Sequence, residues 1–224
     1  AFGWRGPLWF IAGYSVLVLV IVVVTLPETH LAENRDRTTR LLGLPSILRH
    51  LRNRPFMFWV LVQAGSFGAL MAYVASSAFV YQNVLGFDAA TYGMLFAVNL
   101  ACGVVCNFVA NRFLRHLGSR RLVALGLSLS MVGTVLVALG VVLGAPAGVT
   151  AAFMTLSMAP IMLNGPNLVG LALNEVTRWT GSAAAVIGFV QFLSGAIVSP
   201  FVGLWGTATI VPMVATMAAL SGLS

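Results

Sequence analysis

Residues 111–121 read Asn-Arg-Phe-Leu-Arg-His-Leu-Gly-Ser-Arg-Arg, and this stretch decides how the rest of the chain is interpreted. It carries four arginines and no acidic residue. It separates two uncharged apolar runs, residues 92–110 and 122–143, each of about 20 residues, which is the length that a helix needs to cross a bilayer. We therefore interpret it as a tight turn between two membrane-spanning helices. Because arginines in short loops mark the cytoplasmic side, the turn also orients the chain.

The composition agrees with a membrane protein. Hydrophobic residues make up 59% of the 224-residue chain and charged residues only 8%, whereas soluble domains are about 25% charged. The net charge of +7 reflects 12 basic residues, all arginine, which lie in loops between apolar runs, so we expect no binding to nucleic acid. Cys102 and Cys106 lie one helical turn apart in an apolar run and fit small buried side chains better than a disulfide or a metal site.

The apolar runs predict an all-α integral membrane protein with six complete spans and a truncated seventh. The seventh begins near residue 207 and stops at residue 224, which is too short to cross comfortably. The sequence also lacks an initiator methionine, so we expect a piece of a longer protein. The six complete spans are predicted at residues 8–26, 56–81, 92–110, 122–143, 149–173 and 182–205.

A long polar segment, residues 27–55, separates the first two spans and holds half of the arginines. Within it apolar residues recur at helical spacing, with arginines on the opposite face. This pattern predicts a helix that lies on the cytoplasmic membrane surface, and the alternative is a mobile basic linker. The apolar positions are Leu41, Leu44, Ile47, Leu48 and Leu51.

Four spans carry a polar stripe, and lipid does not favour polar side chains, so these stripes should face protein or water. They are the spans at residues 56–81, 92–110, 149–173 and 182–205. The span at residues 122–143 instead carries Gly126, Ser130, Gly133 and Gly140 on one side, a pattern that indicates close helix packing. In the span at residues 149–173 each proline removes a backbone donor, so a helix break is expected at Pro160, Gly165 and Pro166.

Several short motifs, taken in order along the chain, resemble one family. They are Gly3-Trp4-Arg5, Leu26-Pro27-Glu28-Thr29, the Tyr73 to Gln82 run, Gly86, Leu95-Phe96-Ala97, Gly165-Pro166-Asn167 and the Gly181-Ser182-Ala183 to Gln191 run. Together they resemble the C-terminal half of a major facilitator superfamily transporter, and within it the bicyclomycin-resistance (Bcr/CflA) drug:proton antiporters. The resemblance implies a helical bundle of two halves. Residues 1–26 would be the last span of the N-terminal half, residues 27–55 the cytoplasmic linker, and residues 56–224 the six-helix C-terminal half.

The resemblance also implies that the spans with polar stripes face a central substrate cavity. Packing hydrogen bonds between helices remain the alternative for each residue of the stripes. The candidate cavity residues are Gln63, Phe67, Tyr73, Asn99, Asn164, Asn167 and Gln191.

The opening stretch matches the basic part of a signature that the superfamily places in cytoplasmic loops. The matching gate residues are Arg112, Gly118, Arg120 and Arg121, while Asn111 stands where an aspartate is expected. The arginines would bond carbonyls or a carboxylate of the other half when the inner gate closes. The alternative is that they only set the topology.

The resemblance implies secondary active transport, with proton-coupled efflux of amphipathic small molecules across a bacterial inner membrane. The proton would be the coupling ion, with no other cofactor and no metal. The expected partners are the substrate, membrane lipid and the N-terminal half, in a protein that is monomeric when full length. Because every acidic residue lies in a loop or at a span end, we expect the coupling carboxylate in the N-terminal half, unless Asp88 or Glu175 reaches the cavity. The alternatives are an uptake, metabolite or sugar transporter, a polytopic membrane enzyme, or a channel.

Overall fold

The structure is a computed structural model that describes residues 5–25, 43–113, 115–204 and 211–223. It divides into two units, Ala1–Gly43 and Leu44–Ser224, which are described separately. In the first unit α1 spans Arg5–Thr25, and none of its residues is buried. The helix begins at Arg5 rather than at residue 8, because Pro7 falls in the first turn, where a missing backbone donor costs nothing.

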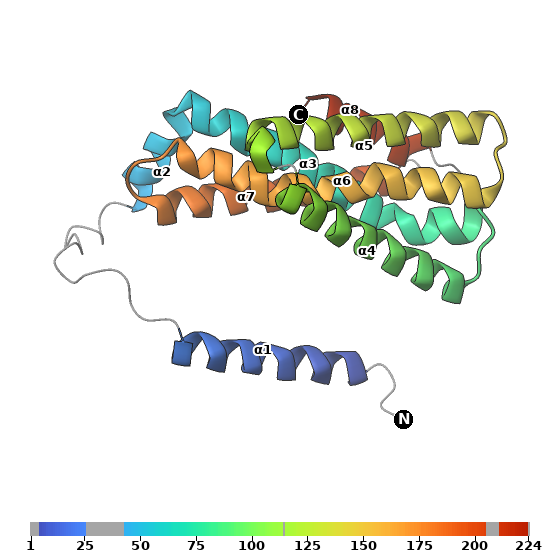
Figure 1. The fold of residues 1–224 in the computed structure, drawn as a ribbon, viewed down its shortest axis with the longest axis horizontal. Helices are drawn as coiled ribbons and strands as arrows, with labels where there is room; N and C mark the ends of the chain where they lie inside the picture. Colours follow the sequence, from blue (N-terminus) through green and yellow to red (C-terminus); the bar gives the residue numbers. More distant parts are fainter. Residues whose placement is uncertain (1–4, 26–42, 114, 205–210, 224) are drawn as a thin grey trace. The chain divides into compact units, whose positions relative to one another are not determined.

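The second unit is a bundle of helices, and its described residues contain no strand (Figure 1). Together with α1, five of its helices are long and apolar enough to cross a membrane, which confirms the six predicted spans. The described part of the last helix is 13 residues long. The elements are α2 (Gly43–Arg52), α3 (Arg54–Phe79), the π-helix η3 (Val80–Val84), α4 (Ala89–Phe113), the 3₁₀ turn η4 (Arg115–Leu117), α5 (Ser119–Val142), α6 (Ala147–Asn174), α7 (Thr180–Leu204) and α8 (Val211–Leu223).

The helix predicted in the polar segment is present as α2, while residues 26–42 of that segment lie outside the described residues. α2 is followed at once by α3, which Asn53 caps by accepting a hydrogen bond from the amide of Phe56 at 3.4 Å. Ile47 of α2 packs against a hydrophobic cluster that includes Phe56 and Val186. The helix is therefore attached to the bundle through its apolar face, whereas its contact with a membrane surface stays a prediction.

The basic turn is shorter than the sequence suggests. α4 continues to Phe113 and α5 begins at Ser119, so Arg112 and Arg120 lie on the ends of helices. Gly118 precedes α5 with φ +80°, a conformation that side chains with a Cβ rarely adopt. The α4–α5 turn and the loop after α6 meet at one end of the bundle, because Arg120 on α5 lies 3.7 Å from Glu175.

α6 is the central helix on one side of the bundle, where it packs against α3, α4 and α5, while α3 also contacts α7 and α8. The closest approach is between α5 and α6. A Cβ atom at Gly133 would lie 2.5 Å from the Cα atom of Ser157, and one at Gly126 would meet the amide of Asn164. The small residues of α5 thus allow close helix packing, as predicted.

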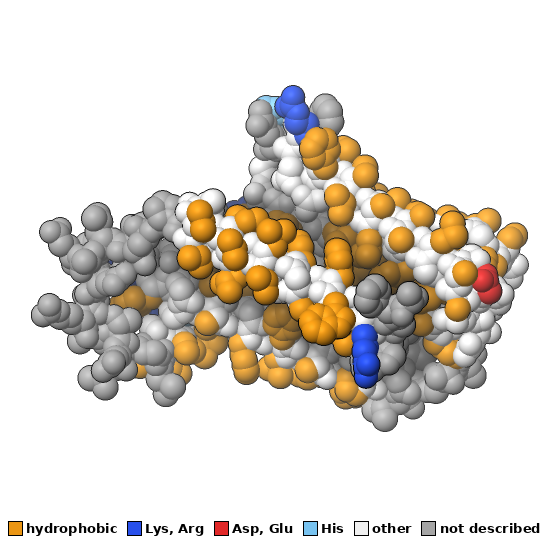
Figure 2. Space-filling view, turned by 90° about the horizontal axis from the view of Figure 1, so that it is seen from below, with side chains coloured by type: hydrophobic (Ala, Val, Ile, Leu, Met, Phe, Trp, Pro, Cys, Tyr) orange, Lys and Arg blue, Asp and Glu red, His pale blue; other side chains and the backbone are white. Residues whose placement is uncertain are grey.

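Among the described side chains visible in Figure 2, hydrophobic ones predominate and only a few are charged. The structure agrees with the sequence pattern on this point, since large apolar side chains such as Phe108, Phe189 and Phe192 are each about two-thirds exposed. Such exposure would be unfavourable in water and suits a bilayer or another part of a membrane protein.

Replacing Gly133 by alanine should destabilise the bundle by about 1–3 kcal/mol, because the new methyl group would press on the backbone of α6. The matched control is Gly170→Ala on α6, where a Cβ meets nothing within 4 Å. Thermal unfolding of the purified protein in detergent should show a lower midpoint for Gly133→Ala and an equal or higher one for Gly170→Ala. Equal midpoints for the two variants would contradict the close contact between α5 and α6.

Candidate functional site

A pair of glutamines joins α3 to α7. Nε2 of Gln63 donates a hydrogen bond to Oε1 of Gln191 at 3.2 Å. One turn along α3, Phe67 meets Phe192 edge to face, with ring centroids 5.3 Å apart. We call Gln63, Gln191, Phe67 and Phe192 the amide seam. Gln63 is 5% exposed and Phe192 is 67% exposed, so the amide seam runs from the interior to the surface. The structure brings together three predicted cavity residues here, and the sequence analysis missed Phe192.

Asn99 of α4 is the centre of a buried hydrogen-bond network. Its Nδ2 donates to the hydroxyl of Tyr73 and, at 3.1 Å, to that of Tyr81, while its Oδ1 accepts from Thr155. Tyr73 is 1% exposed and Asn99 2% exposed. In this conformation the two predicted cavity residues present no surface to a ligand. The structure thus supports the packing alternative for both.

The two asparagines of α6 differ in their surroundings. Asn164 is fully buried, its amide lies against Gly126 of α5, and neither polar atom has a partner among the described residues. Asn164 is therefore directed toward a neighbouring helix in this conformation, and its place in a substrate cavity stays a prediction. Asn167 is half-buried and donates to the carbonyl of Leu163 at 2.9 Å within its own helix.

α6 continues as one α-helix through Pro160, Gly165 and Pro166, so the helical backbone is not interrupted at the expected break. A proline removes the bond to the carbonyl four residues earlier, and for Pro166 this carbonyl belongs to Met162. Nδ2 of Asn107 on α4 donates to that carbonyl oxygen at 3.1 Å. A side chain thus replaces the missing backbone donor, as expected for a proline inside a membrane helix. A bend at this point stays a prediction.

Among the predicted gate residues, Arg120 forms an ion pair within the bundle, although its side chain is 72% exposed. The Arg120 guanidinium approaches the carboxylate of Glu175 and lies 5.6 Å from the centroid of the Trp59 ring. Arg112 and Arg121 are exposed, while Nδ2 of Asn111 donates to the carbonyl of Asn107 at 2.9 Å. The ion pair forms inside the second unit, whereas the sequence analysis had proposed a partner in the other half of the protein. An exposed pair of this kind contributes about 0–1 kcal/mol.

Asp88 caps the start of α4 and is exposed. Its carboxylate accepts hydrogen bonds from the hydroxyl of Thr91 and, at 3.2 Å, from the amide of Ala90. These bonds, that of Thr91 above all, hold the pKa of Asp88 below its usual value. Asp88 is thus a helix cap and does not reach into the bundle. Among the described residues, no group of three or more His, Cys, Asp or Glu side chains could hold a metal ion.

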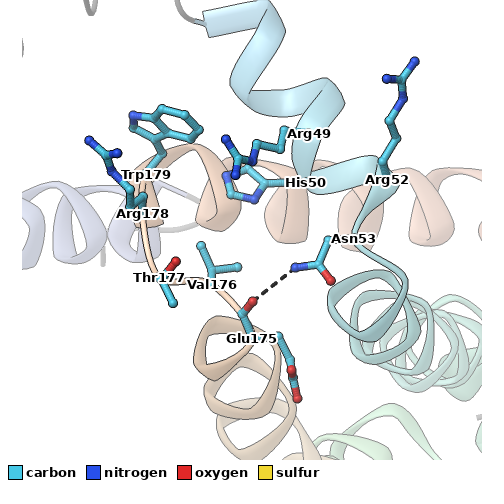
Figure 3. Close-up of a pocket in the computed structure, with 9 residues that line it drawn as sticks. All are labelled: Arg49, His50, Arg52, Asn53, Glu175, Val176, Thr177, Arg178 and Trp179. Carbon is cyan, nitrogen blue, oxygen red and sulfur yellow. Dashed lines mark hydrogen bonds between the residues drawn. The ribbon is translucent and has the colours of Figure 1, made fainter.

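Sequence analysis missed a cavity of about 290 Å³ between α2 and the loop that joins α6 to α7 (Figure 3). Nδ2 of Asn53 donates to the carbonyl of Glu175 at 3.1 Å, and Nε2 of His50 lies 3.0 Å from the hydroxyl of Ser182. His50 is 4% exposed. It lies three residues after Ile47, on the apolar face of α2, and this spacing is the sequence signal that could have indicated its burial. The lining residues are Arg49, His50, Arg52, Asn53, Glu175, Val176, Thr177, Arg178 and Trp179.

Comparison with known proteins identifies the family. A family model described as Major Facilitator Superfamily matches residues 1–200. The chain belongs to the major facilitator superfamily. It is 25% identical to a bicyclomycin resistance protein homolog of Haemophilus influenzae over 221 residues, which cover 97% of this chain and 55% of that protein. It is 27% identical to the uncharacterized MFS-type transporter YdgK of Bacillus subtilis over 201 residues, 90% of this chain and 50% of that protein.

This major facilitator chain therefore spans about half the length of the curated relatives it matches. Family membership and the six long apolar helices found among the described residues make it a multi-pass integral membrane protein. The match also shows the fold class predicted from the sequence.

The bond between Asn107 and the Met162 carbonyl can be tested by a double-mutant cycle in this major facilitator chain. Replacing Asn107 by leucine should destabilise the protein by about 0.6–1.7 kcal/mol, because the carbonyl is left without a donor. In the background of Pro166→Ala the same replacement should cost less, since the alanine amide can bond the carbonyl itself. The measurement is the thermal unfolding midpoint in detergent.

The matched control for this cycle is Asn111→Ala, which removes a bond to Asn107 and leaves the donor to Met162 in place. It should have little effect in either background. Equal costs of Asn107→Leu with and without Pro166 would show that the asparagine does not replace the missing proline donor.

Proposed function

We propose that this major facilitator protein exports amphipathic small molecules across a bacterial cytoplasmic membrane in exchange for protons. The amide seam carries this proposal: a Gln63–Gln191 hydrogen bond next to the Phe67–Phe192 pair, on two facing helices. The bicyclomycin resistance homolog of Haemophilus influenzae supports the drug class, at 25% identity. The chain covers about half of that relative, so the activity of the whole protein is part of the proposal.

The chemistry of the amide seam suits weakly polar substrates. Two carboxamides supply donors and acceptors without a charge, and Oε1 of Gln63 accepts no hydrogen bond from the described residues. The two phenyl rings supply apolar surface beside them. A ligand with an apolar body and a few polar groups could exchange the glutamine–glutamine bond for bonds of its own. A buried charge would favour an ionic substrate, and none of the four seam residues carries one.

Proton coupling needs an ionisable group whose protonation responds to the cavity. Asp88 is engaged as the cap of α4, and Glu175 pairs with Arg120 at one end of the bundle. Glu28, Glu33 and Asp36 lie outside the described residues. These positions favour a coupling carboxylate in an N-terminal half, with this half supplying neutral substrate contacts. The proton is then the coupling ion, and the proposed machinery needs no metal or organic cofactor.

Replacing Gln191 by leucine should lower drug efflux about tenfold, because a substrate amide or hydroxyl loses a partner of about 1–1.5 kcal/mol. Efflux is measured in proteoliposomes of the full-length protein, with and without an imposed pH gradient. The matched control is Ser128→Ala on an exposed position of α5, which should transport like the wild type. Efflux that ignores the pH gradient would refute proton coupling, and equal transport by Gln191→Leu and the control would remove the amide seam from the substrate path.

A further inference from the structure

The cavity between α2 and the α6–α7 loop has an excess of positive charge. Three of its lining residues are arginines, and Glu175 is the one carboxylate among them. That carboxylate pairs with Arg120, which does not line the cavity, at 3.7 Å. In Figure 3 the Glu175 side chain extends away from Arg49 and His50. The one carboxylate of the lining is therefore engaged with a residue outside the cavity.

The cavity has a built arrangement of side chains. The guanidinium carbon of Arg49 lies 5.4 Å from the centroid of the Trp179 ring, and that of Arg178 lies 5.6 Å from it. Cation–π contacts at this distance restrict where a guanidinium can point. Figure 3 shows Arg49 turned toward His50 and Trp179, whereas Arg52 extends away from the other lining side chains.

Trp179 itself is held in an unusual conformation. Its φ is +59°, in the left-handed region that bulky residues rarely adopt. Its carbonyl accepts from the hydroxyl of Ser182 at 2.8 Å and from two amides of the first turn of α7. Ser182 in turn contacts His50, so the strained residue is tied to α2. Strain of this kind persists where the surrounding structure requires it, and binding sites are one such place.

We propose that this cavity binds the phosphate group of an anionic membrane lipid. Arginine side chains form strong, charge-assisted hydrogen bonds with phosphate oxygens. A tryptophan ring beside such arginines is typical of the membrane interface. The volume of about 290 Å³ is at the lower limit for ligand cavities, so it fits a headgroup and leaves the acyl chains outside.

Apolar side chains next to the cavity indicate where the acyl chains would lie. Leu48 and Leu51 on α2 are 51% and 44% exposed, and they adjoin Arg49 and Arg52 in sequence. A free phosphate ion would use the arginines but not the leucines. A phospholipid would use both, and the arginine-rich end of the bundle is the side on which anionic lipids attract basic residues.

The test measures the dissociation constant for phosphatidylglycerol by native mass spectrometry of the purified protein in detergent. Phosphatidylcholine with the same acyl chains serves as the zwitterionic reference. Wild type should bind phosphatidylglycerol more tightly, and Arg49→Gln should weaken it about fivefold, the loss expected for one arginine near anionic lipid. Arg49→Lys keeps the charge and should lose less.

The matched control is Arg112→Gln, which removes the same charge from an exposed position outside the cavity. It should leave the binding of phosphatidylglycerol unchanged, and helical content by circular dichroism should be equal in all variants. Equal weakening by Arg112→Gln would overturn the proposal in favour of general surface charge. A second outcome would also contradict the proposal. If inorganic phosphate stabilises the protein through Arg49, and the protein binds the two lipids equally well, then the phosphate group that the cavity binds does not belong to a lipid.

Discussion

Backbone hydrogen bonds that must be satisfied without water govern this structure. In a hydrocarbon environment an unpaired carbonyl is unfavourable, so a proline inside a spanning helix needs a substitute donor. α6 carries Pro166 in its interior and still runs without interruption, because Asn107 on α4 bonds the carbonyl of Met162. This bond joins α4 to α6, and α6 in turn contacts α3 and α5. One cross-helix bond thus helps to determine how four helices meet.

Periodicity in the sequence predicted which side of each helix is special, but not what that side touches. The stripe on α4 is a clear example, since Asn99 and Gly103 are buried and Val104 and Phe108 are exposed. An amide on a spanning helix avoids lipid equally well beside a neighbouring helix or beside a water-filled cavity. Asn99 and Asn164 lie beside neighbouring helices, whereas the Gln63–Gln191 pair remains compatible with a place beside a water-filled cavity. Only the neighbours in space distinguish these outcomes.

Helix ends and the cavity beside α2 were the least predictable parts. The sequence predicts Arg112 and Arg120 in a loop, whereas both lie on helix ends. A helix end can hold charged side chains in water while its backbone remains hydrogen-bonded as a helix. The cavity is formed by residues far apart in the sequence, such as Asn53 and Glu175, which are 122 positions apart and whose contact no local pattern reveals. His50 likewise lies in the interior, where its ring centroid is 5.5 Å from that of Phe56.

The π-helical turn at Val80–Val84 has a consequence for how related chains should be aligned. A π-turn holds one residue more than the α-helical turn it replaces, as the bond from the Leu85 amide to the Val80 carbonyl shows. Deleting one residue just before Tyr81 would restore a regular helix and rotate later side chains by about 100°. The hydroxyl of Tyr81 would then leave Asn99, to which it is now bonded. A relative with a single-residue gap at this position must therefore complete its buried amide with a different side chain.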